Sequence, residues 1–466
     1  MLFAKKKPNV LSFVSVAGLA VGVLCACSSA KKEPAARMGE YLRAARQFWN
    51  FQGSVLVSRS GEAAFEASLG MARLEDGVEN TPSTRFLIGS VTKTFTAAAV
   101  MQLADKGLLD FDDPLRKYVP EYPEKTGAAI TIRHLLTHTS GVPEAVTDPR
   151  ALGDMTKPKT PLELIGLIED KDLDFAPGER AAYSSTGYVL LGLVIERVSE
   201  KSYYDYIRDH VCGPLGMAST GYKEDWRDAP GFARGYVEGR NGQLAEAPRI
   251  HLSLGFSAGA LYSTVRDLLK WDAGLRGDAI LSRDSREMMF RAARDGFGCG
   301  WLVMETWGRK DLAHGGGAPG FNAWVERWPD EDVFIAVLSN NGGSPVGEIG
   351  RSLAAILFGE PYQFPGSRGI VSIDPDLLGG YTGAYRIDAQ NVREVLREGR
   401  ALFVIRNGGR KYPILPYGED RFFFPNDKGA TVRFLRDDAG QVTGHVFHQL
   451  GLDETATKIA AGVDAF

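Results

Sequence analysis

The chain has 466 residues but only 4 cysteines and 7 histidines. Cys25 and Cys27 stand near the N-terminus, so only Cys212 and Cys299 remain in the body of the chain. Two cysteines do not make a disulfide framework, although they could pair in an oxidising compartment. Both lie in apolar surroundings, and we expect them to be free, buried thiols. No cysteine–histidine cluster has the spacing of metal ligands, so we predict no metal site. The glycine run Gly315–Gly317 is not followed by the Gly-Lys-Ser/Thr of a phosphate-binding loop, so we expect neither a nucleotide nor another cofactor.

A concentrated positive charge is also missing. The formal net charge is −4, and residues of both signs are spread along the chain. Because nucleic-acid-binding proteins need a basic stripe or arm, we expect no nucleic-acid partner. The hydrophobic fraction of 44% allows a large core, and a chain of this length is expected to hold more than one domain.

The first residues lack the length of a membrane span. A basic segment, Lys5–Lys7, precedes an apolar run from Val10 to Leu24. This run is shorter than the about 20 residues that a membrane span needs. This pattern is typical of a secretory signal. The run ends in a segment that resembles the lipobox of bacterial lipoproteins, which implies a lipid on Cys27; a plain signal-anchor is the alternative.

These features predict a signal over residues 1–27 and a polar tether over residues 28–36. The lipid would hold the protein on the periplasmic side of the cell envelope. Ser28 is not the aspartate associated with inner-membrane retention, so the resemblance favours the outer membrane.

Hydrophobic periodicity predicts a first domain over residues 37–360. Strands and helices stand at both ends of this domain and helices fill its middle. We therefore expect one antiparallel sheet assembled from both ends, with an all-α insertion between them. The expected elements at the two ends are 37–48, 54–58, 63–69, 300–306, 321–328, 333–339 and 346–358.

A linker is expected over residues 361–373. Beyond it, over residues 374–466, the helical pattern vanishes and short alternating strands follow at regular spacing. This predicts a small all-β, lipocalin-like barrel. The expected strands are 381–387, 392–397, 401–406, 421–425, 431–436 and 442–449.

The most informative stretch begins at Phe86. Gly89 and Ser90 interrupt an extended run, and apolar residues then recur at helical spacing up to Gly107, a predicted C-cap. On this helix Ser90 and Lys93 lie about one turn apart on one face, so the amine can take or tune the proton of the hydroxyl. The alternative is a serine N-cap and a solvated lysine. The helix is rich in alanine, so its start is expected to be buried. Lysine is rarely buried without a partner for its charge, so a functional role for Lys93 is favoured.

Two further motifs follow along the chain. Ser90–Lys93 is S-x-x-K, Tyr183–Ser185 is Y-x-S, and His314–Gly316 is H-x-G. Their order, spacing and flanking segments resemble the serine β-lactamase and penicillin-binding protein family, above all class C β-lactamases and family VIII esterases. The resemblance covers roughly residues 37–360. It implies an α/β (α+β) fold of the β-lactamase/transpeptidase type, with the active site between the sheet and the helical insertion.

The resemblance also implies a role for each residue. Ser90 would form an acyl-enzyme, and Lys93 and Tyr183 would handle its proton as a pair. Which of the two is the base stays open, because a tyrosine with a reference pKa near 10 needs a nearby cation to stabilise its phenolate. The backbone N–H groups of Ser90 and Gly317 are the implied oxyanion hole. Gly316 and Gly317 are implied to bind substrate, because glycine lets a backbone approach closely.

Two positions depart from the family pattern. His314 stands where many members have lysine, and at its reference pKa it is charged only about a quarter of the time near pH 7. This weakens recognition of a substrate carboxylate and favours the esterase and D-peptidase branches. Ser185 replaces the usual asparagine and lacks the two amide donors that would hold an acyl-amide side chain.

Three other patterns are interpreted as structural or accidental. Gly255–Gly259 matches the nucleophile elbow G-x-S-x-G, but no helix is predicted directly after it, so Ser257 is a weak candidate. Lys125–Gly127 matches K-T-G but precedes the tyrosine motif. His134 and His138 have i, i+4 spacing without an acidic third ligand, so we expect structural roles for both.

The sequence therefore predicts a serine hydrolase that acts through acyl-Ser90 on an ester, a D-amino-acid peptide or a lactam. A β-lactamase or DD-carboxypeptidase is the second enzymatic interpretation. A receptor for penicillin or cell-wall material, acylated without turnover, is the non-enzymatic one. The expected partner is a small-molecule or cell-wall peptide substrate, and the role of the β-domain stays open.

Overall fold

The computed structural model describes residues 33–239, 243–366, 373–399, 401–424, 427–449 and 452–459. The predicted signal sequence, with Cys27 at its end, lies outside the described residues, as does most of the predicted tether. Within the described ranges, no helix combines the length and the apolar character needed to cross a membrane.

Helices dominate the middle of the first domain. The α-helices are α1 (Pro34–Trp49), α2 (Thr92–Asp105), α3 (Glu124–Gly127), α4 (Ile132–Leu136), α5 (Pro149–Leu152), α6 (Pro161–Gly166), α7 (Ser185–Ser199), α8 (Tyr203–Tyr206), α9 (Phe256–Gly259), α10 (Val265–Arg276), α11 (Arg283–Met289) and α12 (Val346–Phe358). The 3₁₀ or π turns are η1 (Gly89–Val91), η2 (Leu115–Lys117), η3 (Ile207–Cys212), η4 (Trp226–Asp228), η5 (Leu252–Leu254) and η6 (Pro375–Tyr381).

Strands lie mainly at the two ends of the same domain, and three short ones lie between them. They are β1 (Gly53–Arg59), β2 (Glu62–Leu69), β3 (Met71–Arg73), β4 (Val78–Glu79), β5 (Phe86–Leu87), β6 (Tyr236–Glu238), β7 (Leu244–Glu246), β8 (Tyr262–Ser263), β9 (Leu302–Thr306), β10 (Arg309–Ala318), β11 (Phe321–Trp328) and β12 (Val333–Ser339).

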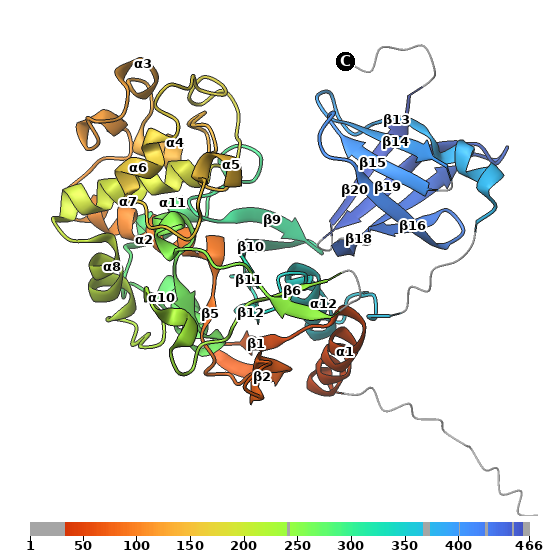
Figure 1. Ribbon diagram of the computed structural model, residues 1–466, viewed down its shortest axis with the longest axis horizontal. Helices are drawn as coiled ribbons and strands as arrows, with labels where there is room; N and C mark the ends of the chain where they lie inside the picture. Colours follow the sequence, from red (N-terminus) through yellow and green to blue (C-terminus); the bar gives the residue numbers. More distant parts are fainter. Residues whose placement is uncertain are drawn as a thin grey trace, which may run out of the picture. The chain divides into compact units, whose positions relative to one another are not determined.

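Six of these strands form one sheet in the order β2-β1-β12-β11-β10-β9 (Figure 1). β1 pairs antiparallel with β12, from Gly53 opposite Ser339 to Arg59 opposite Val333. The two strands are buried along almost their whole length, because apolar layers cover both of their faces. This confirms the predicted antiparallel sheet assembled from two distant segments.

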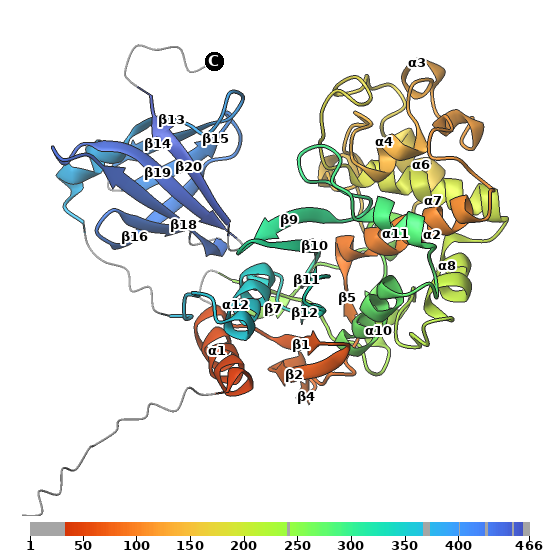
Figure 2. The same ribbon diagram turned by 180° about the vertical axis from the view of Figure 1, so that it is seen from behind.

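Helices cover the central strands on both faces. α1 and α12 pack on one face through apolar side chains that meet those of β1, β11 and β12. The other face carries the larger core, to which α2, α7 and α10 contribute (Figure 2). The functional residues discussed below lie where this second layer meets β10.

β10 was not among the predicted strands, although it carries His314. Three successive glycines, Gly315–Gly317, leave no alternating pattern, and glycine is depleted in strands. The strand forms because β11 pairs with it from Leu312 to Ala318, whereas β9 pairs only with its first half. The second half of β10 therefore has one neighbouring strand and packs against η1.

The C-terminal strands form a closed barrel (Figure 1), which confirms the predicted all-β architecture. Its strands are β13 (Gly383–Arg386), β14 (Val392–Glu398), β15 (Ala401–Arg406), β16 (Tyr412–Gly418), β17 (Arg421–Phe424), β18 (Asp427–Arg436), β19 (Val442–Gln449) and β20 (Leu452–Lys458). Two of them were not predicted: β16 holds Pro413 and Pro416, and β20 is mostly polar. β16 forms because it pairs with β15 and β17, and β20 forms because it pairs with β19 and back onto β13, which closes the ring.

Cys212 and Cys299 are free and buried, as predicted. Burial raises the pKa of each thiol to about 12. Both side chains are therefore neutral members of the core.

The close packing of α7 against α9 can be tested by measuring the stability of a variant. A Cβ on Gly192 would lie 2.1 Å from Ser257 Oγ, so we expect Gly192→Ala to lower the free energy of unfolding by about 1–3 kcal/mol through overpacking. A Cβ on Gly166, at the end of α6, would meet no heavy atom within 4 Å. Gly166→Ala is the matched control and should be neutral or stabilising by up to about 1 kcal/mol. Urea unfolding of both variants measures the difference, and equal stabilities would contradict the close packing.

Candidate active site

Ser90 lies in η1, the turn that leads into α2, and its side chain is partly exposed. Gly89 has a φ of +50°, a left-handed conformation that glycine adopts without strain. A Cβ at Gly89 would come within 2.6 Å of the backbone nitrogen of Gly317. The turn and β10 are thus in direct backbone contact, and glycine permits it.

Lys93 follows one turn later on α2, as predicted, and is fully buried. Its Nζ lies 3.1 Å from Ser90 Oγ, 3.2 Å from Ser185 Oγ and 2.8 Å from the carbonyl oxygen of Ala258. Burial lowers the pKa of Lys93 to about 7, and the negative charge of Glu144 opposes this shift. Near neutral pH the amine is therefore about half deprotonated.

The three neighbours of Nζ suit a neutral amine. The Ala258 carbonyl can only accept, so Nζ donates one N–H to it. A neutral amine has a second N–H for Ser185 Oγ and a lone pair that accepts from the Ser90 hydroxyl. Deprotonated Lys93 thus leaves no polar atom of this cluster without a partner and is placed to receive the serine proton.

Tyr183 stands just before α7, with its ring close to Lys93. Nζ of Lys93 lies 4.8 Å from the ring centroid, and the hydroxyl interacts with the side chains of Ser90 and Ser185. Tyr183 is 41% exposed whereas Lys93 is fully buried, so a substrate arriving from solvent meets Tyr183 first. Burial around the hydroxyl raises the pKa of Tyr183, so the phenol stays protonated over the range in which Lys93 titrates.

His314 lies on β10 with its ring centroid 6.1 Å from that of Tyr183. The expected partial charge at neutral pH is wrong. Burial, with a smaller contribution from Lys93, lowers the pKa of His314 to about 3, so the imidazole is neutral. Its Nδ1 lies 2.6 Å from the Gly315 carbonyl, which can only accept, so Nδ1 carries the proton and Nε2 is an acceptor.

The other predicted binding residues lie beside the serine. Ser185 is the first residue of α7 and touches Lys93, as described above. A Cβ at Gly316 would fall 2.0 Å from the carbonyl oxygen of Ile88 and 3.0 Å from the backbone nitrogen of Ser90. Gly316 therefore lets β10 approach the serine turn more closely than any residue with a side chain would, whereas a Cβ at Gly317 would meet only Asn322 Oδ1 at 3.9 Å.

His138 holds the tyrosine motif in place, a role more specific than the structural one expected from the sequence. Its ring stacks on Tyr183 with centroids 4.5 Å apart, and its Nδ1 accepts a hydrogen bond of 3.1 Å from the backbone N–H of Ser184. Its carbonyl accepts from the N–H of Ala182 at 2.9 Å. His138 is buried and has a φ of +57°. Burial lowers its pKa, so the ring against Tyr183 is neutral.

Glu144 is a residue that the sequence did not point to. Its carboxylate accepts from the backbone N–H of Ser185 and of Thr147 and from the hydroxyl of Thr186. An acidic group at the start of α7 is stabilised by the helix dipole. Glu144 also acts on the charge of Lys93 across the site. Its only signal in the sequence was its place shortly after the segment Thr137–Gly141, which resembles the family.

The rejected candidates lie elsewhere or are buried. Ser257 is fully buried and donates to the carbonyl of Tyr188, so it is no nucleophile. Lys125 is exposed on α3 and pairs with Asp172. Within the described ranges, no three histidine, cysteine or acidic residues are placed to hold a metal ion.

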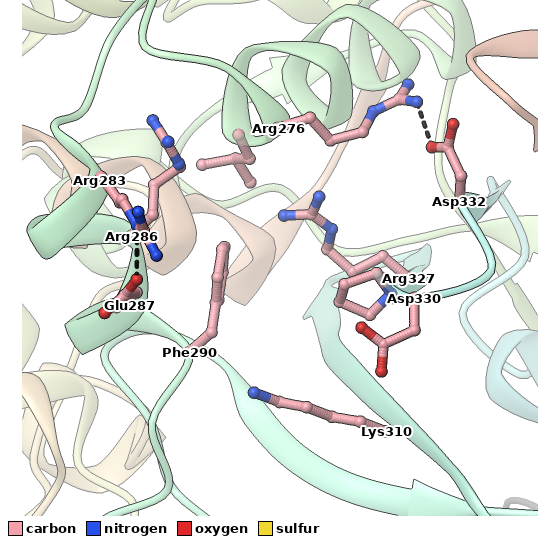
Figure 3. A pocket seen from close by; sticks show the side chains of 11 residues that line it. Arg276, Arg283, Arg286, Glu287, Phe290, Lys310, Arg327, Asp330 and Asp332 are labelled. Carbon is pink, nitrogen blue, oxygen red and sulfur yellow. Dashed lines mark hydrogen bonds and ion pairs between the residues drawn. The ribbon is translucent and has the colours of Figure 1, made fainter.

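A basic pocket of about 700 Å³ is lined by none of these residues (Figure 3). It is lined by Leu275, Arg276, Arg283, Arg286, Glu287, Phe290, Lys310, Arg327, Pro329, Asp330 and Asp332. Arg276 pairs with Asp332, and Arg283 pairs with Glu287. The described lining residues carry no hydroxyl, thiol or imidazole, so this pocket offers no nucleophile of those types, and the Ser90 cluster is the candidate active site.

Comparison with known proteins agrees with this geometry. Residues 43–358 match the family model described as Beta-lactamase. Penicillin-binding protein 4* of Bacillus subtilis (strain 168) is 28% identical over 435 residues, which cover 88% of this chain and 95% of that protein. The octameric penicillin-binding protein homologue from Pyrococcus abyssi is 27% identical with a TM-score of 0.66, covering 91% of this chain and 99% of that one. A D-stereospecific amidohydrolase from Streptomyces sp. is 26% identical with a TM-score of 0.57, covering 66% of this chain and 94% of that one.

A sheet assembled from both ends of a domain, with a helical insertion and a serine–lysine pair at their junction, defines the β-lactamase/transpeptidase-like class. The family model spans more than half of the chain. The chain therefore belongs to the beta-lactamase family.

The charge of Glu144 gives a pH prediction. Because this carboxylate raises the pKa of Lys93, Glu144→Gln should lower that pKa further and move the acid limb of Ser90 reactivity to lower pH. The rate at which a fluorophosphonate labels Ser90, followed as a function of pH, measures the limb. Glu163→Gln, in the exposed capping box of α6, is the matched control and should leave the limb in place. A limb that stays fixed or rises in Glu144→Gln would contradict the coupling.

Proposed function

We propose that this protein is a serine hydrolase that acts through an acyl-Ser90 intermediate on an ester or a D-amino-acid peptide. The observation that carries the proposal is the 3.1 Å contact between Ser90 Oγ and the buried amine of Lys93, whose pKa is about 7. A lysine of ordinary pKa would be protonated at neutral pH and could not accept the proton of serine. The fold alone would not support this function without that shifted amine.

In the proposed acylation, Ser90, Lys93 and Tyr183 act one after another. Ser90 Oγ attacks the substrate carbonyl carbon while its proton passes to Lys93 Nζ. Lys93 is the base of the pair, because its pKa is near neutrality whereas that of Tyr183 is raised. When the carbon–leaving-group bond breaks, the Tyr183 hydroxyl donates its proton to the leaving atom. Lys93 restores the proton of Tyr183 through Ser185, whose side chain contacts both residues, and is neutral again. A water molecule then attacks the acyl carbon and loses a proton to Lys93. As the bond between the acyl carbon and Ser90 Oγ breaks, Lys93 gives this proton to Oγ, which restores the free enzyme.

The negative charge that develops on the carbonyl oxygen needs donors that are fixed before the reaction. The backbone N–H groups of Ser90 and Gly317 are the proposed pair, supported by the close approach of η1 and β10. Ser90 also precedes α2, so the positive end of the helix dipole adds to the stabilisation.

The third motif bears on the choice of substrate. His314 is neutral and its Nε2 accepts, so this position supplies neither a positive charge nor an N–H for a substrate carboxylate. This supports an ester or a D-amino-acid peptide whose contact with β10 does not depend on a carboxylate. The similarity to a D-stereospecific amidohydrolase supports the D-amino-acid branch.

A second candidate is a receptor that is acylated without turnover. The similarity to penicillin-binding protein 4* favours it. In that case Ser90 would open a β-lactam ring and keep the acyl group, because water could not attack it.

Replacing the nucleophile separates these functions. Ser90→Ala should lower the turnover of nitrophenyl esters and D-amino-acid peptides by about a thousandfold or more, because it removes the only group that bonds to the acyl carbon. Ser257→Ala is the control and should keep most of the turnover, since Ser257 is buried away from substrate. Initial rates on a panel of esters, D-peptides and β-lactams measure both. Stable labelling by a fluorescent penicillin with no turnover of any substrate would favour the receptor, and loss of turnover in Ser257→Ala alone would refute the assigned site.

Changing the third motif tests the role of His314. His314→Lys should raise kcat/KM for a carboxylate-bearing β-lactam relative to a neutral ester by about tenfold, the effect of one charge-assisted hydrogen bond. His314→Gln, which is neutral, should leave this ratio unchanged. A ratio that rises equally in both variants, or in neither, would show that this position does not select against carboxylates.

We also propose that the protein is secreted and held at the outer membrane by a lipid on Cys27, with a small molecule or cell-wall peptide as its substrate. The basic segment, the apolar run and the lipobox-like ending support this placement.

A further inference from the structure

The open end of the C-terminal barrel contains a cavity of about 430 Å³, a volume typical of small-molecule sites. It is lined by Arg393, Val404, Arg406, Arg410, Tyr412, Phe424, Ala430, Phe447 and Gln449. All of these residues belong to the barrel. The cavity is therefore separate from the Ser90 site.

Apolar groups form one part of its wall. Phe424 and Phe447 meet edge to face with ring centroids 5.6 Å apart, and Val404 and Ala430 are buried beside them. The guanidinium of Arg393 lies 4.3 Å from the ring centroid of Phe447. The cavity thus offers an apolar surface that ends at a cation.

Positive charge exceeds negative charge at this end. Arg393 and Arg406, which face each other on β14 and β15, both pair with the carboxylate of Glu454. Arg410 adds a third cation and contacts the ring of Tyr412. Among the described residues that line the cavity, none is acidic. Arg393 and Arg406 therefore share the single carboxylate of Glu454. In the pocket of Figure 3, by contrast, Arg276 and Arg283 each pair with a carboxylate of their own, Asp332 and Glu287.

Arg393 shows that the arrangement is incomplete. Its side chain is only 3% exposed, yet Nη1 has no hydrogen-bond partner among the described residues. A buried guanidinium N–H without a partner is costly, and native proteins leave few of them. An anion in the cavity would supply the missing acceptor and offset the desolvation that lowers the pKa of Arg393.

We propose that the barrel binds an organic monocarboxylate with an apolar body. The carboxylate pairs with Arg393, Arg406 and Arg410, and the apolar body lies against Phe424 and Phe447. The body is an alkyl chain or an aromatic ring, since both fit an aromatic wall.

Isothermal titration of the full chain tests the site. The Ser90→Ala chain serves as parent, so that the catalytic site leaves the probes unchanged. Octanoate and phenylacetate are the aliphatic and aromatic probes, and octanamide is the uncharged counterpart of octanoate. We expect at least one of the two carboxylates to bind with one site per chain, and octanamide to bind at least tenfold more weakly than octanoate if octanoate binds. Binding of neither carboxylate, or equal binding of octanoate and octanamide, would overturn the proposal.

Three variants test whether the carboxylate binds in this cavity. Val404→Phe fills the cavity without changing charge and should abolish binding. Arg393→Gln should weaken carboxylate binding at least tenfold. Arg421→Gln removes an exposed arginine of β17 outside the cavity and should leave binding unchanged. Binding that survives Val404→Phe, or that falls equally in Arg393→Gln and Arg421→Gln, would overturn the assignment. If Arg393→Gln does not fold, Val404→Phe still tests the location of the site, and the comparison of octanoate with octanamide still tests the need for a carboxylate.

Discussion

The exclusion of water from the amine of Lys93 is the constraint on which the candidate active site depends. α2 is buried along nearly its whole length, and Lys93 lies near its start, so its amine meets side chains and a carbonyl where an ordinary lysine meets solvent. The neighbours come from three separate segments: Ser90 from η1, Ser185 from α7 and Ala258 from α9. The packing of these helices therefore sets the pKa of the amine as well as its position. A loosened contact anywhere among them would admit water and return Lys93 towards its ordinary protonated state.

A second layer of residues fixes the groups that touch the amine. His138 stacks on Tyr183 and accepts from Ser184, while Glu144 accepts from Ser185. Both come from the short connection between α4 and α5. This connection thus orients the tyrosine motif through its backbone and tunes the lysine through its charge. Mobile groups at a reacting centre lose rate steeply, and buried hydrogen bonds of this kind limit that mobility.

The sequence predicted those features of the site that depend on local structure. It did not predict the features that depend on contacts between distant segments. Ser90 and Lys93 were predicted to meet because a helix places residues three apart on one face. The sheet was predicted because its strands alternate or are continuously apolar, and the barrel because its strands repeat. β10 was missed because its glycines carry no pattern and the strand depends on its pairing with β11. The neutrality of His314 was missed because its pKa depends on burial by distant segments. Glu144 was missed because nothing in its own neighbourhood marks it as facing Lys93.

The buried lysine also ties the stability of the fold to proton concentration. In the unfolded chain Lys93 regains its ordinary pKa of 10.5, whereas in the folded chain it is about 7. Between these two values the unfolded chain binds the extra proton, so raising the pH through this interval favours the folded state. Below it, both states are protonated and the folded chain carries the full cost of a desolvated ammonium ion. The same desolvation that lowers the pKa of Lys93 thus makes this region less stable in acid than a protein with a solvated lysine at that position.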